Sequence, residues 1–189
     1  TRELLVVAVD LPHISNFTDL DALRLEPDVV VRIARTAEDL AGADAIIVPG
    51  SRNVFADLGY LWTSGLGRAV RSSSAELVGI CGGLQMLGTA ITDPAGVESG
   101  GLAARPLDLL PLATEMAVDK VLCQAAARFV PTGEDVRGYE IHHGQTRVTD
   151  GRIRPVMTRA DGTVIGWGRA DGLVWGTYLH GVFDADIFR

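Results

Sequence analysis

The chain has 189 residues and a formal net charge of -7 at pH 7, with 47% hydrophobic and 22% charged residues. This length suits one ordinary domain, and the composition excludes disordered, collagen-like and disulfide-scaffold proteins. The negative charge has the wrong sign for a protein that binds nucleic-acid backbones, so no nucleic-acid partner is expected.

The cysteines and the apolar residues indicate a reducing compartment away from membranes. Cys81 and Cys123 do not form a secreted disulfide framework, and neither belongs to a CxxC or Cys/His spacing that binds zinc. The sequence has no run of about 20 apolar residues, the length of a membrane span. Thr1 to Glu3 carry no basic-then-apolar signal pattern. We therefore expect a cytoplasmic protein with no metal site and no membrane partner.

Four short apolar runs near the N-terminus predict strands that are covered on both faces in a parallel sheet. These runs are residues 4–9, 29–33, 45–48 and 77–80. Between the last two, residues 54–73 carry apolar side chains at roughly helical spacing and predict one crossover helix. Strands that alternate with helices indicate an α/β sheet.

After residue 101 the sequence changes to short stretches of alternating apolar and polar residues, separated by Gly, Pro and Asp. This pattern is typical of strands. The expected strands are 116–122, 127–130, 137–142, 145–148, 164–169 and 173–179. Because the chain is too short for two cores, we expect these strands to be antiparallel additions to the same sheet. The prediction is a single α/β domain, residues 1–189, with a mixed, mainly parallel central sheet flanked by helices.

Residues 79–88 have the pattern of a nucleophile elbow, in which a buried strand, a sharp turn at a reactive side chain and an apolar helix follow one another. Gly79, Gly82 and Gly83 leave room for a strained turn and for a substrate. A thiol at a helix N-terminus is favoured as the thiolate. Cys81 is therefore the candidate nucleophile, and the backbone N–H of Gly82 is the candidate oxyanion donor. A buried, unreactive cysteine on a tight turn is the alternative.

A cysteine nucleophile needs a general base, which can lie far away in sequence. His180 ends a strand-like run, 175–180, and is followed by glycine, which predicts an imidazole at a sheet edge beside a turn. His142, followed by His143 and Gly144, ends a similar run, so the pattern separates the two candidates only weakly. We take His180 as the base, and the alternative is a solvent-exposed or capping histidine.

Four segments occur in an order that resembles a known family. They are residues 49–53, 79–88, 138–142 and 176–181. Together with 11–19 and 180–184, they are similar to the class I glutamine amidotransferase domain of cobalamin-pathway amidases, most closely the cobyric acid synthases. The resemblance covers nearly the whole chain and implies the flavodoxin-like fold of class I glutamine amidotransferases.

The resemblance implies a glutaminase mechanism for the two candidate catalytic residues. Cys81 would attack the side-chain amide of glutamine, which gives a γ-glutamyl thioester and ammonia, and His180 would shuttle the proton. Most class I members follow this histidine with Pro and then Glu, and that Glu orients the imidazole, whereas glycine and valine follow it here. Glu140, Asp184 and a backbone carbonyl are the candidates for orienting His180.

The resemblance also implies the surroundings of the substrate. Gly50 and Ser51 would lie beside the site, with backbone N–H groups that join that of Gly82 in the oxyanion hole. Gln85, one turn after the cysteine, would help to hold the substrate glutamine. The turn at residues 142–144 would approach the pocket from another side.

The resembled synthases also contain an ATP-dependent domain that activates corrinoid carboxylates and receives the ammonia. No GxxxxGK[ST] phosphate loop occurs in this sequence. We therefore expect no cofactor in this domain, and we expect ATP, Mg and the corrinoid to bind an N-terminal synthetase domain of a longer chain, or a partner subunit. The rival functions are a glutaminase that serves cobyrinic acid diamide synthase or cell-wall isoglutamine amidation, a non-catalytic amidotransferase-like binding domain, and a cysteine hydrolase of another amide.

Overall fold

The computed structural model describes residues 3–100 and 104–189, so Thr1, Arg2 and position 101 of the patterns above lie outside it. The strands are β1 (Leu4–Val9), β2 (Val29–Ala34), β3 (Ala45–Val48), β4 (Glu76–Ile80), β5 (Ala90–Thr92), β6 (Leu112–Phe129), β7 (Asp135–Val148), β8 (Ile153–Arg159), β9 (Val164–Arg169) and β10 (Val174–Thr177). The helices are α1 (Asp21–Arg24), α2 (Val54–Thr63), α3 (Leu66–Ser72) and α4 (Gly82–Leu87), with short 3-10 helices η1 (Phe17–Leu20), η2 (Glu38–Leu40) and η3 (Val182–Asp184).

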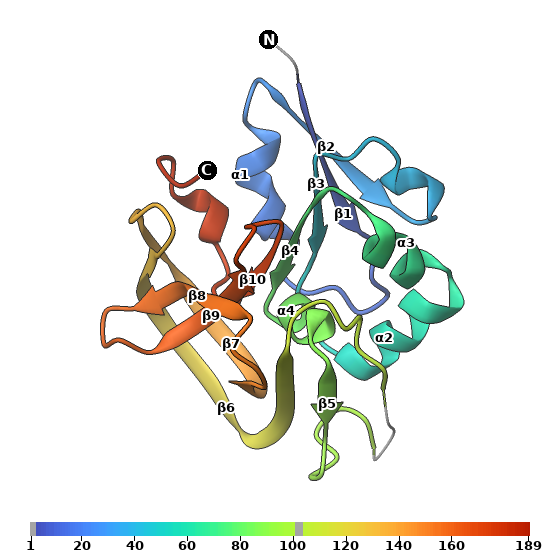
Figure 1. Ribbon diagram of the computed structural model, residues 1–189, viewed down its shortest axis with the longest axis vertical. Helices are drawn as coiled ribbons and strands as arrows, with labels where there is room; N and C mark the ends of the chain where they lie inside the picture. The colour runs from blue at the N-terminus through green and yellow to red at the C-terminus, as the bar shows by residue number, and fades with distance from the viewer. Residues whose placement is uncertain (1–2, 101–103) are drawn as a thin grey trace.

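One ten-stranded mixed sheet runs through the molecule in the order β2-β1-β3-β4-β10-β9-β8-β6-β5, and β7 pairs with β6. The strands from β2 to β10 in this order are parallel to one another. The strands β9, β8, β6 and β7 continue the sheet through antiparallel pairs. In Figure 1, α2 and α3 lie on one side of β1, β3 and β4, and α1 lies on the other. The predicted mixed, mainly parallel sheet with antiparallel additions in the C-terminal half is confirmed, except that β10, which was expected to be one of those additions, pairs parallel with β4.

The four predicted N-terminal strands all form, but the second differs in its environment. In β2 the side chains alternate between half-buried and exposed, and only Ala34 at its end is buried. The prediction that both faces of this strand are covered is therefore wrong. The reason is its place at the edge of the sheet, where it pairs only with β1.

The predicted single helix over residues 54–73 is two helices, α2 and α3. Gly65 lies between them with φ of 84°, a left-handed conformation that glycine adopts without steric cost. The second helix then packs closely against the first, since a Cβ on Gly67 would lie 3.1 Å from the carbonyl oxygen of Leu61. Of the glycines in this predicted helix, Gly65, which adopts the left-handed conformation, is the one at which the helix is interrupted.

Two of the C-terminal strands are longer than the sequence pattern predicts, β9 has the expected bounds, and β10 is shorter than the expected 173–179. The expected pairs 116–122 with 127–130, and 137–142 with 145–148, are the two long strands β6 and β7 of one hairpin. Their register shifts between Met116 and Val121, and this irregularity interrupts the alternation of side chains. The strand β8 was not expected, because it contains Pro155 and proline is rare inside strands.

The close approach of α4 to β3 predicts a large effect of one glycine substitution. A Cβ on Gly83 would lie 1.9 Å from the carbonyl oxygen of Val48. We expect Gly83→Ala to lower the free energy of unfolding by about 3 kcal/mol, because the backbone of a central strand must move. Gly59, inside α2, faces open space. Gly59→Ala is the control and should raise the free energy of unfolding by about 0.5–1 kcal/mol. Urea unfolding measures both, and equal stabilities would contradict this packing.

Candidate active site

Cys81 occupies the single-residue turn between β4 and α4. Its backbone has φ of 51° and ψ of −107°, a conformation that residues with a Cβ rarely adopt. Its N–H donates a hydrogen bond of 2.7 Å to the carbonyl oxygen of Thr177, which ties the turn to β10. The thiol is 3.5 Å from the carbonyl oxygen of Ile141. The turn therefore has the strained strand-to-helix geometry of a nucleophile elbow.

The peptide N–H groups of Ser51 and Gly82 lie next to each other beside the elbow. A Cβ on Gly82 would lie 2.9 Å from the nitrogen of Ser51. The carbonyl oxygen of Gly50 accepts a hydrogen bond from the N–H of Ser15. The peptide bond between Gly50 and Ser51 is trans, so the N–H of Ser51 points in the opposite direction to that carbonyl. Gly82 is the first residue of α4, where an N–H has no partner within the helix. The peptide N–H groups of Ser51 and Gly82 thus lie beside Cys81, and their role as oxyanion donors stays a prediction.

A buried carboxylate fixes the loop that carries Ser51. The hydroxyl of Ser51 donates to Asp57 Oδ2 at 2.6 Å. The other oxygen of Asp57 accepts from the backbone N–H of His13 at 3.1 Å and lies 2.8 Å from Nδ1 of the same residue. Asp57 is fully buried, so these bonds hold the β3–α2 loop against the segment that follows β1.

His180 follows β10, which lies in the middle of the sheet, so the predicted location at a sheet edge is wrong. Its side chain is fully buried, with Nδ1 2.7 Å from Asp19 Oδ2. The N–H of the next residue, Gly181, donates to the other oxygen of Asp19 at 2.8 Å. Tyr139 stacks on the ring with 5.1 Å between centroids. A Cβ on Gly50 would lie 2.9 Å from Cε1 of His180, so this glycine makes room for the imidazole.

Asp19 therefore orients His180, and the two carboxylates that sequence analysis named do not. Glu140 is buried on β7, where it forms ion pairs with His142 at 3.2 Å and Arg159 at 3.4 Å. Asp184 is exposed. Asp19 stands 161 residues before the histidine. It belongs to segment 11–19 of the resemblance, which was the only signal in the sequence that pointed to it.

The pKa of His180 is raised from its usual value of 6.5 to about 10. Burial lowers this pKa. The hydrogen bonds to Asp19 and Cys81 and the charges of those two groups raise it, and together they outweigh the effect of burial. The imidazole is thus stabilised as a cation between a carboxylate and the thiol. Cys81, His180 and Asp19 therefore have the arrangement of a catalytic triad, in which a base lies between a nucleophile and the group that orients the base.

Gln85 is held in place on α4 and presents an acceptor without a partner. Its Nε2 donates to the hydroxyl of Tyr178 at 3.3 Å. A Cβ on Gly144 would lie 2.2 Å from this nitrogen, so the strand β7 clamps the side chain. Among the described residues, Oε1 of Gln85 has no hydrogen-bond partner although it is buried. A buried acceptor without a partner favours a ligand that donates an N–H.

Residues 142–144 lie inside the strand β7, so the predicted turn is wrong, but His142 and His143 border the same site. His142 stacks on Tyr178 with 3.8 Å between ring centroids, and its Nδ1 lies 2.8 Å from the carbonyl oxygen of Gly144. His143 Nδ1 lies 3.1 Å from the carbonyl oxygen of Ala117. Both imidazoles are therefore fixed by contacts within the hairpin.

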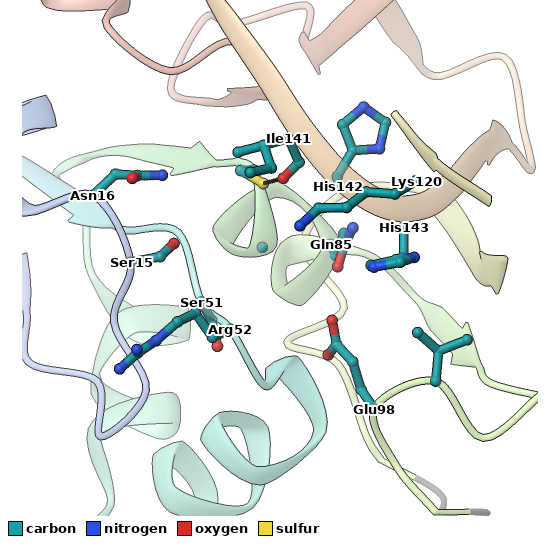
Figure 2. A pocket seen from close by; sticks show the side chains of 13 residues that line it. Ser15, Asn16, Ser51, Arg52, Gln85, Glu98, Lys120, Ile141, His142 and His143 are labelled. Atoms are coloured by element: carbon teal, nitrogen blue, oxygen red, sulfur yellow. Dashed lines mark hydrogen bonds between the residues drawn. The ribbon is translucent and has the colours of Figure 1, made fainter. Parts of the chain in front are cut away.

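Some of these residues line a cavity of about 370 Å³ (Figure 2), and His180, Asp19 and Tyr178 are not among the lining residues. Of the residues proposed from sequence, those that line it are Ser51, Cys81, Gly82, Gln85, His142 and His143. Gly50 and Gly144 lie behind the lining and pack against His180 and Gln85. The lining residues that sequence analysis did not propose are Ser15, Asn16, Arg52, Val97, Glu98, Lys120 and Ile141. The cavity is large enough for an amino acid and has the thiol in its wall.

The described residues contain neither a cluster of metal ligands nor a membrane-spanning helix. No three His, Cys, Asp or Glu side chains come together as metal ligands do within residues 3–100 and 104–189. Over the same part of the chain, no helix is both long and apolar enough to span a membrane.

Comparison with known proteins places the chain in a family. Residues 5–188 match the family described as CobB/CobQ-like glutamine amidotransferase domain. Cobyric acid synthase of Nitratidesulfovibrio vulgaris is 46% identical over 97% of this chain and 41% of its own length. The adenosylcobalamin biosynthesis bifunctional protein CobDQ of Leptospira interrogans is 45% identical over 97% of this chain and 22% of its own. Cobyric acid synthase of Salmonella choleraesuis is 43% identical, with 99% and 39% covered. The chain thus spans less than half of each relative.

Solved structures agree with this placement at the level of the fold. The crystal structure of a glutamine amidotransferase has a TM-score of 0.72 at 19% identity and covers 96% of this chain and 93% of its own. PurLQS from Thermotoga maritima has a TM-score of 0.67 at 17% identity, with 94% and 87% covered. The family match and the shared fold together show that this chain belongs to the CobB/CobQ-like glutamine amidotransferase domain family.

Proposed function

We propose that the chain is the glutaminase domain of a cobyric acid synthase, which releases ammonia from glutamine for the ATP-dependent amidation of corrinoid carboxylates. The observation that carries the proposal is the line of Asp19, His180 and Cys81, with the thiol on a strained elbow beside two backbone N–H donors. The relatives named cobyric acid synthase, at 43–46% identity over nearly the whole chain, support the choice of acceptor.

In the first half of the proposed reaction, the thiolate of Cys81 attacks the carbon of the glutamine side-chain amide. The oxyanion that forms accepts hydrogen bonds from the N–H groups of Ser51 and Gly82. The imidazolium of His180 gives its proton to the amide nitrogen, the C–N bond breaks, and ammonia leaves. The product on the enzyme is a γ-glutamyl thioester.

In the second half, neutral His180 takes a proton from a water molecule, which attacks the thioester carbon. The C–S bond breaks, glutamate leaves, and the thiolate and imidazolium are restored. Asp19 holds the same ring orientation in both halves, because it binds Nδ1 of His180, so that Nε2, which lies 3.3 Å from Nδ2 of Asn16, is the nitrogen that exchanges the proton. The unpaired Oε1 of Gln85 is positioned to accept an N–H of the bound substrate.

The activation of the acceptor belongs elsewhere in the proposed enzyme. The chain has no phosphate loop, and it spans only 22–41% of the length of the relatives described above. We propose that ATP, Mg and the corrinoid bind a synthetase domain of the same polypeptide or of a partner subunit, and that this domain receives the ammonia.

The acceptor assay tests this proposal with the full-length polypeptide that carries the chain. Given glutamine, ATP and Mg, we expect it to convert corrinoid side-chain carboxylates to amides, as followed by mass spectrometry. A peptidoglycan precursor with a glutamate residue is the parallel acceptor and should stay unmodified. Amidation of that precursor alone would replace the corrinoid as acceptor but keep the glutaminase, whereas no hydrolysis of glutamine would remove the glutaminase itself.

A further inference from the structure

The cavity wall away from the thiol carries a carboxylate without a cation, that of Glu98. This side chain is half-buried, and its Oε2 accepts a hydrogen bond of 2.9 Å from the backbone N–H of Val54. Within residues 3–100 and 104–189, no Lys, Arg or His forms an ion pair with it. Burial raises the pKa of Glu98, although the N–H of Val54 and the charge of His143 act in the opposite direction. A half-buried carboxylate in this position is stabilised by a cationic ligand.

The loop that carries Glu98 is built to hold it in place. Asp93 accepts hydrogen bonds from the backbone N–H groups of Val97, Glu98 and Ser99 at 2.8, 2.9 and 2.8 Å. The side chain is tied separately to Val54, the first residue of α2. The backbone and the carboxylate of Glu98 are thus fixed by two independent sets of bonds, as expected of a binding group that is organised before its ligand arrives.

The cavity matches the charges at the far end of glutamine. Figure 2 shows the carboxylate of Glu98 and the ammonium of Lys120 reaching from different elements into the space beside Gln85. Both residues line the cavity that contains Cys81. When the amide of glutamine lies at the thiol, its two methylene groups place the α-ammonium and α-carboxylate away from the elbow. Opposite charges that line the same cavity fit a zwitterion.

We propose that Glu98 binds the α-ammonium of the substrate and so restricts this site to amides of free amino acids. The inference rests on the proposed glutaminase function and adds a residue that determines specificity. An ammonium that donates to the free oxygen of Glu98 forms a charge-assisted hydrogen bond, which is stronger than a neutral one. Glutamine in a peptide lacks this ammonium, and so does glutaramate, which is glutamine without its amino group.

Steady-state kinetics of the Glu98→Gln variant test the inference in the full-length polypeptide, with L-glutamine and glutaramate as the two substrates. We expect kcat/KM for glutamine to fall about 10- to 100-fold, mainly through KM, while kcat/KM for glutaramate changes less than about threefold. Glutamine at position 98 still offers an oxygen to the N–H of Val54, so the cap of α2 is kept. Glu115→Gln, on an exposed part of β6, is the matched control and should leave both values unchanged.

Each other outcome of this experiment has a distinct meaning. If Glu98→Gln keeps the wild-type preference for glutamine over glutaramate, the inference is overturned and the glutaminase stands. If the variant loses both substrates equally, Glu98 supports the structure of the site, and the inference is again overturned; a slower alkylation of Cys81 by iodoacetamide would accompany that result. A wild-type enzyme that hydrolyses no glutamine overturns both the inference and the proposed function.

Discussion

Replacing Cys81 with alanine is expected to abolish glutamine-dependent amidation by the full-length enzyme and to leave amidation from added ammonia intact. The thiol is the only group at the elbow that can form the thioester, so kcat for glutamine hydrolysis should fall at least about 10³-fold. Added ammonia enters the reaction after the step that Cys81 performs, so the synthetase half should keep its rate. The two rates are measured in parallel with glutamine and with ammonium chloride.

Cys123 provides the matched control for this loss. It is half-buried on β6, where its sulfur lies 3.8 Å from Nη1 of Arg159 and outside the lining of the cavity. Cys123→Ala should retain glutamine-dependent amidation within about twofold, because Cys123 does not line the cavity that contains Cys81. Glutamine hydrolysis by the Cys81→Ala variant at the wild-type rate would show that another group is the nucleophile.

Replacing Asp19 with asparagine is expected to lower kcat for glutamine hydrolysis about 10²- to 10⁴-fold. The amide keeps the size of the side chain but removes the charge that raises the pKa of His180 and fixes its ring. The imidazole would then lose its orientation toward the thiol, while KM for glutamine changes little. Asp184→Asn is the control, because Asp184 is exposed, and it should leave kcat unchanged.

The same variant has a pH signature that a merely structural role of Asp19 would not produce. The pKa of His180 is raised in the folded state, from 6.5 to about 10, so folding binds a proton between these values. The stability from the Asp19–His180 pair is therefore complete below pH 6.5, while Asp19 is ionised, and it is lost as the pH rises toward 10.

This signature is measured in a Cys81→Ala background, which removes the titration of the thiol. The same substitution removes the part of the rise in the pKa of His180 that Cys81 causes, so the pair loses its stability at a lower pH than in the wild-type protein. Below pH 6.5, adding Asp19→Asn should lower the free energy of unfolding on the order of 3 kcal/mol, the cost of breaking a buried pair. The difference between the two proteins should shrink as the pH rises. A difference that stays constant with pH would mean that His180 does not carry its charge at Asp19.

The parts of the site that follow one another along the chain could be predicted from sequence, and the parts that fold back from a distance could not. The elbow is visible because an apolar strand, Cys81 and its glycines, and an apolar helix occupy ten consecutive residues. Glu98 lies in a loop whose backbone is arranged by Asp93, and a lone carboxylate in a Gly-rich stretch carries no local signal. Asp19 was missed for the same reason, since only the tertiary fold brings it to His180.

The fold shows the same division between local and distant causes. The four N-terminal strands of the parallel half were predicted because each is an almost continuous apolar run, and burial selects such runs directly. The fifth strand, β10, was expected to be antiparallel, because its parallel pairing with β4 depends on strand order and not on its own residues. In β7 the prediction was divided at the register shift, between His142 and Gly144, and this shift depends on how the two strands meet and not on the alternation of either strand alone. In β6 the prediction was divided at residues 123–126, where the pairing is regular. The edge position of β2 likewise depends on strand order and not on its own residues.

The most direct test of the account is covalent labelling of the full-length enzyme with a diazo-ketone analogue of glutamine, followed by mass spectrometry of the intact protein and of its peptides. The analogue reacts with a nucleophile only where the glutamine site presents it. We predict one adduct per chain, located on Cys81, and protection by excess glutamine. An adduct on another residue, or no adduct while the enzyme still hydrolyses glutamine, would contradict the assignment of Cys81 as the nucleophile.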